Sequence, residues 1–239
     1  MEDKLTMSGM VTVPVIFLRD SISNDGAFQI ETIPDCKPPF VHLLKPHKLF
    51  LIIMIILPFA KHSCLCMQLN TIHLRQLNQL DEGHFLLTMQ KSRDFHYPFV
   101  SAPQTHEEFQ SYLQKSLQED RRCYLALNQN EDIIGVFNIS EIVRSVFQSA
   151  YLGYFASVTH AGQGLMSQAL KLVLKEIFLN LKLHRLEANI QPTNTSSIHL
   201  VTRNGFLKEG FSPRYLKING IWCDHFRFAL THEDWLANQ

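Results

Sequence analysis

The segment that most constrains this chain runs from a strand-like stretch through a glycine-containing loop directly into an apolar helix pattern. The strand pattern covers 149–157, the loop holds Gly162 and Gly164, and the helix pattern covers 166–181. This order points unpaired backbone N–H groups and the positive end of the helix at one place, where an anion can bind. Glycine lets the backbone approach an anion closely because it lacks a Cβ. From these residues alone, a diphosphate-type ligand and a plain structural turn both remain open.

Two common nucleotide-binding loops do not fit this segment. A P-loop needs Lys followed by Ser or Thr after its last glycine, and no such pair follows Gly164. A dinucleotide-binding fingerprint needs a third glycine and an acidic residue about 20 positions further on, and both are missing. The loop therefore predicts a phosphate site of another kind, or none.

From Asn70 onward, strand and helix patterns alternate. Period-two alternation indicates strands, and apolar residues spaced three and four apart indicate helices. The predicted order is β-α-α-β-β-β-α-β-α-β-β, which is an α/β domain. Strands are expected at 70–77, 123–128, 132–140, 149–157, 184–190, 215–220 and 224–230, and helices at 80–92, 105–119, 166–181 and 194–204.

Composition limits the classes of partner. The 22 basic and 22 acidic side chains cancel, so charge gives no reason to expect direct binding to nucleic acid or stable association with an anionic membrane. Five scattered cysteines favour free thiols in a reducing compartment over a disulfide framework, so we expect a cytoplasmic protein. These cysteines are Cys36, Cys64, Cys66, Cys123 and Cys223.

The first 66 residues have no clear period and read as an N-terminal extension of uncertain structure. They contain a short apolar run, 49–60, which is broken by Pro58 and is too short to span a membrane. Three interpretations remain open: an interfacial anchor, an extra packed segment, or a stretch upstream of a true start at Met67. We favour the last and expect the folded domain to be residues 67–239.

Several motifs in the correct order resemble one known family. The stretches "YLGYF", "AGQGLMSQAL" and "HRLEANIQPTNTSSIHLVTRNGF" are similar to GCN5-related N-acetyltransferases. The stretches "GFLKEGFSPRYLKINGIWCDH" and "ALTHEDW" resemble the RimJ branch, the ribosomal-protein-alanine N-acetyltransferases. The resemblance covers about residues 69–235. It implies a mixed, mostly antiparallel sheet flanked by helices, in which a splayed strand pair forms the acetyl-CoA cleft.

The resemblance also implies which residues bind the co-substrate. Backbone groups of Phe155, Ala156 and Ser157 would hold the pantetheine arm and the acetyl carbonyl. Asn194 would contact the coenzyme from the start of the next helix. The pyrophosphate would lie on the loop formed by Ala161, Gly162, Gln163, Gly164, Leu165 and Met166. No metal is expected.

Three candidate catalytic residues follow from the same resemblance. The hydroxyl of Ser197 would protonate the departing thiolate, directly or through water; the alternative is that Ser197 only starts a helix. Glu187 is a candidate water-mediated base or an ordinary carboxylate on a strand face. Asp224 would shape the acceptor site or brace a strand. An α-amino group has a pKa of about 7.7 to 8.0, so a weak base suffices.

The leading expectation is an enzyme that transfers acetyl from acetyl-CoA to a protein N-terminal amine by direct attack in a ternary complex. The N-terminal alanine of a small-subunit ribosomal protein is the first candidate acceptor. A second possibility is the same chemistry on a small amine such as an aminoglycoside, a polyamine or an amino acid. A non-catalytic acyl-CoA-binding protein is a third, because Ala161 and Tyr151 depart from the residues common in the superfamily.

Overall fold

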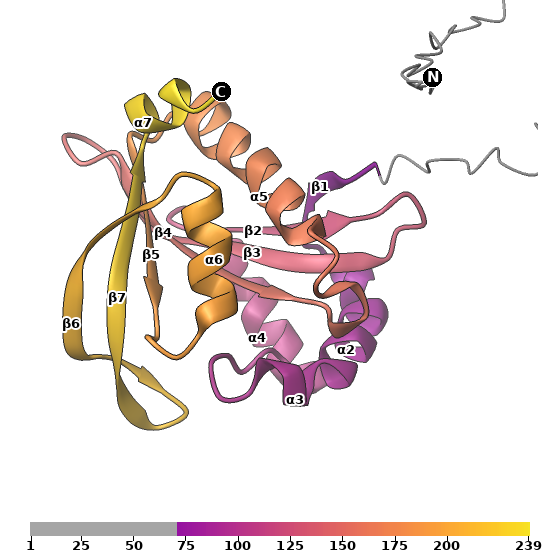
Figure 1. Cartoon of the computed structure of the whole chain (residues 1–239). Coiled ribbons are helices and arrows are strands. Elements are labelled where there is room, and N and C mark those ends of the chain that lie inside the picture. The colour runs from indigo at the N-terminus through magenta and orange to yellow at the C-terminus, as the bar shows by residue number, and fades with distance from the viewer. Residues whose placement is uncertain (1–70) are drawn as a thin grey trace, which may run out of the picture. The chain divides into compact units, whose positions relative to one another are not determined.

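The computed structural model describes residues 71–239, which lie in one compact unit that spans Met67–Gln239 (Figure 1). The expected N-terminal extension, including its apolar run, lies outside the described residues. Within the described part, no helix is both long and apolar enough to cross a membrane.

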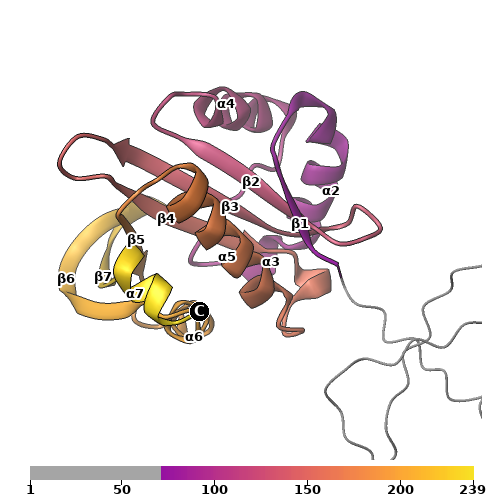
Figure 2. The same ribbon diagram turned by 90° about the horizontal axis from the view of Figure 1, so that it is seen from above.

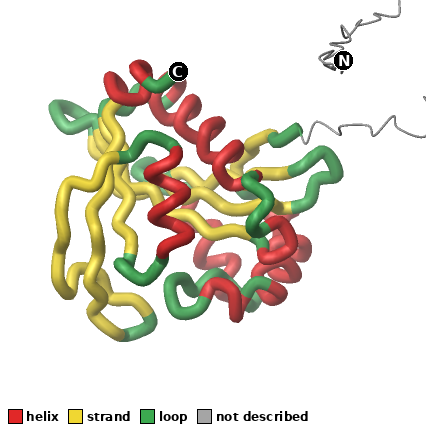
Figure 3. The backbone as a smooth tube through the Cα atoms, viewed as in Figure 1, coloured by secondary structure: helices red, strands yellow, loops and turns green. Residues whose placement is uncertain are grey.

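A seven-stranded sheet forms the centre of the domain, with strand order β1-β2-β3-β4-β5-β7-β6 (Figure 3). β4 and β5 run parallel, and the other neighbouring strands pair antiparallel. This arrangement confirms the predicted mixed, mostly antiparallel sheet. The strands are β1 His73–Gln76, β2 Arg122–Leu127, β3 Ile133–Val143, β4 Ser149–Ala156, β5 Arg185–Ile190, β6 Leu207–Ile218 and β7 Ile221–Thr231.

Helices cover both faces of the sheet (Figure 2). α2, α3 and α4 lie on one face, and α5 and α6 lie on the other, so the domain has three layers. A π-helical turn, Glu176–Asn180, extends α5. The helices are α2 Glu82–Lys91, α3 Arg93–His96, α4 His106–Ser116, α5 Leu165–Lys175, α6 Thr195–Arg203 and α7 His232–Ala237.

β4 lies between two apolar layers because its side chains alternate between the faces. Ala150, Leu152 and Tyr154 pack in the core beneath α5 and α6. Phe155 packs in the second core, with residues of α2 and α4. A strand covered on both faces is held in position by packing from two directions.

Two elements near the C-terminus differ from the sequence expectation. β6 begins at Leu207 instead of at 215. The sequence pattern missed its first half because most of these residues are exposed and two register shifts interrupt the alternation of side chains. α7 was not predicted; it follows β7 directly, and the hydroxyl of Thr231 caps it by accepting from the N–H of Asp234. Trp235 of this helix is buried against Phe178, with ring centroids 5.3 Å apart.

Candidate acetyl-transfer site

β4 and β5 pair over a short distance and then separate. Their register runs from Ser149–Arg185 to Tyr151–Glu187 and stops there. Beyond this point β4 continues along β3 and β5 continues along β7, so each strand keeps its outer neighbour. We call the resulting gap the opening. It confirms the predicted splayed strand pair.

The backbone of Tyr154 and Ala156 faces the opening. The N–H of Ser157 donates to the C=O of Ile134 at 2.8 Å, so Ser157 and every second residue before it direct their backbone groups toward β3. The backbone N–H and C=O of Phe155 therefore also face β3. Of the three residues expected to hold the pantetheine arm, Ala156 is directed into the opening, whereas Tyr154 was not anticipated. A sequence does not reveal which residues of a strand bond to which neighbour, and this explains the difference.

The glycine loop, residues 161–166, leads into α5. Gly162 and Gly164 have φ of +73° and +74°, the left-handed region that favours glycine. A Cβ placed on either residue would meet no atom within 4 Å. Gly164 is the N-cap of α5 and no side chain caps the helix, so the first N–H groups of the helix are free to bind a ligand.

Side chains of the same loop anchor it to the domain. Leu165 is buried in the core. Met166 lies over Gly135 of β3, where an added Cβ would come within 2.3 Å of its sulfur. Gln163 donates from Nε2 to the C=O of Thr159, in the turn that precedes the loop. The loop is therefore fixed by its side chains while its backbone stays exposed.

The start of α6 is tied to β4. Asn194 Oδ1 accepts from the N–H of Ser197 at 3.1 Å, so the side chain of Asn194 caps the helix and its amide NH₂ remains available. The C=O of Ser197 accepts from the hydroxyl of Tyr154 at 3.1 Å. Within the described residues, the Ser197 hydroxyl itself has no hydrogen-bond partner. Tyr154 thus brings Ser197 close to the opening, and burial raises the pKa of the Tyr154 phenol, which stays a donor.

A recess of about 380 Å³ lies on the other face of the sheet, next to the opening. Tyr151 lies near Tyr215 there, and burial, together with the neighbouring Tyr215 hydroxyl, raises the pKa of Tyr151. Asn189 Oδ1 is shielded from solvent and has no partner within the described part of the chain. We call this cavity the strand recess. It is lined by Ser140, Glu141, Tyr151, Leu152, Gly153, Asn189, Tyr215 and Leu216.

The other two candidate catalytic carboxylates are already engaged by protein groups. Glu187 lies on the recess face of β5 and accepts from Arg185 Nε at 2.8 Å. Asp224 accepts from the N–H of Arg214 at 2.7 Å and so braces the paired strands β6 and β7. His225, beside Asp224, is buried, and its Nδ1 lies 2.9 Å from the C=O of Cys223. Among the described residues, no hydrogen bond joins Ser197, Glu187 and Asp224 to one another.

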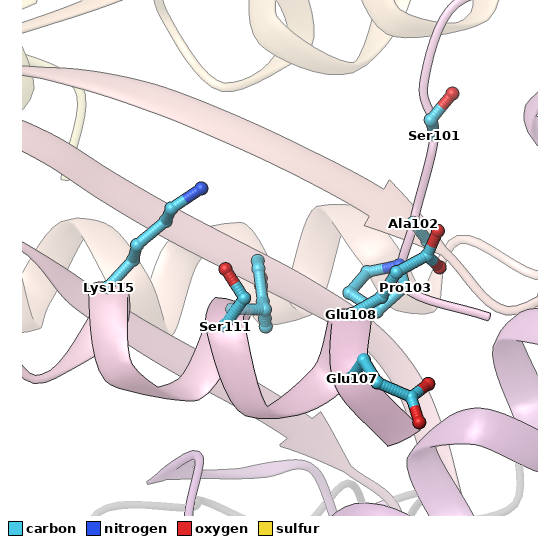
Figure 4. A pocket seen from close by; sticks show the side chains of 8 residues that line it. Ser101, Ala102, Pro103, Glu107, Glu108, Ser111 and Lys115 are labelled. Atoms are coloured by element: carbon cyan, nitrogen blue, oxygen red, sulfur yellow. The ribbon is translucent and has the colours of Figure 1, made fainter. Parts of the chain in front are cut away.

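A second recess, of about 420 Å³, lies between α4 and the loop at 101–103 (Figure 4). None of the residues predicted for the site lines it. Tyr112 connects it to the sheet by donating to Asn138 Oδ1 at 2.5 Å. Its walls are formed by Ser101, Ala102, Pro103, Glu107, Glu108, Ser111, Tyr112 and Lys115. Within residues 71–239, no group of three or more His, Cys, Asp or Glu side chains could hold a metal ion.

The sequence of this chain matches known acetyltransferases. The acetyltransferase (GNAT) domain family matches residues 71–207. A probable N-acetyltransferase of Bacillus subtilis, YjcK, is 32% identical over 175 residues, which cover 69% of this chain and 96% of that protein. The ribosomal protein uS5-alanine N-acetyltransferase of Escherichia coli is 43% identical over 105 residues. That match covers 44% of this chain and 54% of the relative, about half of its length.

Solved acetyltransferase structures share the fold. The spermidine N-acetyltransferase of Vibrio cholerae, in complex with CoA and spermine, aligns with a TM-score of 0.60 at 22% identity. The alignment covers 69% of this chain and 98% of that one. At this identity, the likeness concerns the fold.

Proposed function

The chain belongs to the GNAT acetyltransferase family, and on that premise we propose that it acetylates the α-amino group of a protein N-terminus. An N-terminal alanine of a small-subunit ribosomal protein is the first candidate acceptor. The acyltransferase class and the use of acetyl-CoA follow from the family. The ribosomal acceptor is supported by the partial match to the uS5-alanine enzyme.

The residues around the opening fit acetyl-CoA. Acetyl-CoA, when bound, supplies an acetyl group activated as a thioester. Tyr154 offers its backbone N–H and C=O along the opening, and Ala156 offers its N–H, since its C=O accepts from His96. The free N–H groups near Gly164 suit a pyrophosphate. Asn194 keeps its amide NH₂ for a further contact. These groups come from the backbone or from a cap, so the missing family side chain at Ala161 does not prevent binding.

The two faces of the opening suggest separate tasks. The amine would enter from the strand recess and form a bond to the acetyl carbon while the carbon–sulfur bond breaks. The amine would lose its proton to a water molecule, and Glu187 is a candidate base that would accept the proton from this water. The sulfur would gain a proton from the Ser197 hydroxyl or through water on the α6 side. Asp224 would keep the β6–β7 wall of the recess in position.

The observation that carries the choice of acceptor is the charge of the strand recess. Its lining includes a single carboxylate, Glu141, which is already paired with Arg121 at 2.7 Å. A polyamine carries several positive charges, and burying them requires several opposite charges. One terminal amino group, followed by a small side chain, needs much less compensation. The recess therefore favours a peptide N-terminus over a polycation.

A thiol-release assay with acetyl-CoA tests this proposal. We expect turnover with a peptide that begins with alanine, and none with the same peptide after chemical acetylation of its N-terminus. Spermidine and an aminoglycoside, each at the same concentration, serve as competing acceptors. Faster turnover with spermidine than with the peptide would overturn the proposal in favour of a small-amine acetyltransferase.

A further inference from the structure

Two buried polar side chains hold the chain where β4 ends and the glycine loop approaches. Ser92 is fully buried and His96 is 5% exposed. They lie where α2 gives way to α3, and their backbone partners in this segment follow 66 positions after Ser92 and 60 positions after His96. Neither belongs to the opening, the strand recess or the motifs of the sequence analysis.

Each of these side chains bonds to the backbone of this segment. His96 Nε2 lies 2.8 Å from the C=O of Ala156, so the ring donates from that nitrogen. Ser92 Oγ accepts from the N–H of Val158 at 3.0 Å and donates to the C=O of Thr88 at 2.8 Å. The segment from 156 to 158 is thus bonded on the helix side at both ends.

The residue between these two contacts is bonded on another side. The N–H of Ser157 donates to the C=O of Ile134 on β3. The ring of His96 also packs edge-on against Phe155, with centroids 5.4 Å apart. Four successive residues are therefore fixed in both position and rotation. Rotation matters because it decides which backbone groups face the opening.

From this geometry we propose that Ser92 and His96 are positioning residues for acetyl-CoA. They set the rotation of β4 so that Tyr154 and Ala156 face the opening, and they fix the point from which the glycine loop starts. Neither side chain touches the co-substrate. They bond to the C=O of Ala156 and the N–H of Val158, and by fixing these two points they orient the neighbouring backbone groups of Tyr154 and the N–H of Ala156, which face the opening. The proposal rests on the acetyl-CoA site and not on the identity of the acceptor.

The chemistry of His96 fits a positioning role better than a purely packing role. Its Nδ1 is buried without a partner within the described residues. Leaving a polar atom buried and unpaired opposes folding, and an apolar side chain of similar size avoids that cost. Burial also lowers the pKa of His96, so the ring stays neutral near pH 7 and keeps the proton on Nε2 for Ala156.

Four variants of the full chain test the proposal. Ser92→Ala and His96→Leu remove the two contacts, and His96→Gln retains an N–H donor at the ε position. Met89→Ala is the matched control, because Met89 is fully buried on α2 one turn before Ser92 and contributes packing only. The Kd for CoA is measured by calorimetry at a temperature where each variant is folded, together with Tm.

We expect Ser92→Ala and His96→Leu to weaken CoA binding about tenfold, the equivalent of one lost hydrogen bond of ordinary strength. His96→Gln should bind CoA more tightly than His96→Leu. Met89→Ala should lower Tm at least as much and leave the Kd unchanged. If His96→Leu does not fold, Ser92→Ala decides, since it removes a single oxygen atom.

Two results would overturn the proposal. One is an unchanged Kd for CoA in a folded Ser92→Ala variant. The other is an equal loss of affinity in Met89→Ala, which would mean that any destabilisation of the helical layer weakens binding. Since CoA is measured without an acceptor, a failure here leaves the proposed acceptor untouched. A failure of the peptide assay likewise leaves this proposal standing.

Discussion

The glycine loop and the strand recess lie at the same opening in the sheet but are assembled in different ways. The loop is one short segment that presents backbone to a ligand, and a Cβ added at Gly162 or Gly164 would meet no atom within 4 Å. The recess takes its lining from four strands, between Ser140 and Leu216. The loop is therefore specified locally, whereas the recess exists only after the sheet has formed. Substitutions in the loop should therefore change co-substrate binding, and substitutions in the recess should change acceptor choice, each without affecting the other.

The largest expected effect comes from placing a charge on the loop. Gly164→Asp puts a carboxylate beside the expected phosphates, and juxtaposed like charges cost several kcal/mol. We expect the Kd for CoA to rise at least about 100-fold in calorimetry. Gly220→Asp is the matched control: Gly220 also has positive φ (+84°) and open space around its Cβ, but lies in the β6–β7 turn. An equal loss of CoA affinity in the two variants would mean that backbone strain, and not the added charge, causes the effect.

A second test separates chemistry from helix capping on the loop side of the opening. Ser197→Ala should lower kcat by about 100-fold if the hydroxyl donates a proton to the thiolate. Because the side chain of Asn194 forms the cap, Tm should stay near the wild-type value. The exposed neighbour Ser196 supplies the control, Ser196→Ala. Wild-type turnover in Ser197→Ala would assign the proton to water.

The recess side is tested by filling it. Gly153 lines the recess, and a Cβ there would contact only Asn138, at 3.9 Å. Gly153→Leu should raise the KM for the peptide by about tenfold or more through steric exclusion, and leave the Kd for CoA unchanged. Gly83→Leu, which adds the same side chain in open space on α2, is the control. Weaker CoA binding in Gly153→Leu would show that the two sites are not separable.

The smallest effect concerns stability against pH. Burial lowers the pKa of both His96 and His225 from the ordinary value of 6.5. As pH falls below about 6.5, the unfolded chain takes up protons that the folded chain does not, so the free energy of unfolding decreases. Arg185 lowers the pKa of Glu209, which acts only below about 4.5. Urea titrations at pH 7.5, 6.5 and 5.5 should show this loss.

The variant His96→Gln isolates one contribution to that slope. It should lose less stability than the wild type between pH 6.5 and 5.5. His106, whose pKa the bond to Glu82 raises, acts in the opposite direction and is present in both proteins. A steeper slope in the variant would contradict the assignment of a lowered pKa to His96.

The features foreseeable from sequence are those encoded within a few neighbouring residues. Gly164 at the start of α5, Asn194 at the cap of α6 and the order of the strands and longer helices up to α6 all depend on local pattern, whereas the four-residue helix α3 was not predicted. The resemblance supplied the splay of β4 and β5, which no spacing of residues encodes.

The features that the sequence did not reveal depend on residues distant along the chain. The direction of the Tyr154 backbone depends on its pairing with β3, and the bonds from Ser92 and His96 span 66 and 60 positions. Ser92 and His96 are each a single polar residue in a stretch whose other residues follow an ordinary helix pattern. Periodicity reports which face is apolar, but it does not report which distant carbonyl a buried donor meets.

The separation of β4 from β5 also has a consequence for cooperativity. Among the described strands, the β-ladder between β1–β4 and β5–β7 covers the register from Ser149–Arg185 to Tyr151–Glu187. Beyond this register the two halves are joined by the apolar layer beneath α5 and α6 and by scattered hydrogen bonds such as that from Tyr154 to Ser197. Without co-substrate, hydrogen exchange should therefore reveal two blocks of the sheet with different protection. A molecule bound along the opening contacts both blocks, so CoA should merge them into a single unfolding unit and raise Tm with its concentration. In this way the bound co-substrate links β4 to β5 where the two strands no longer pair with each other.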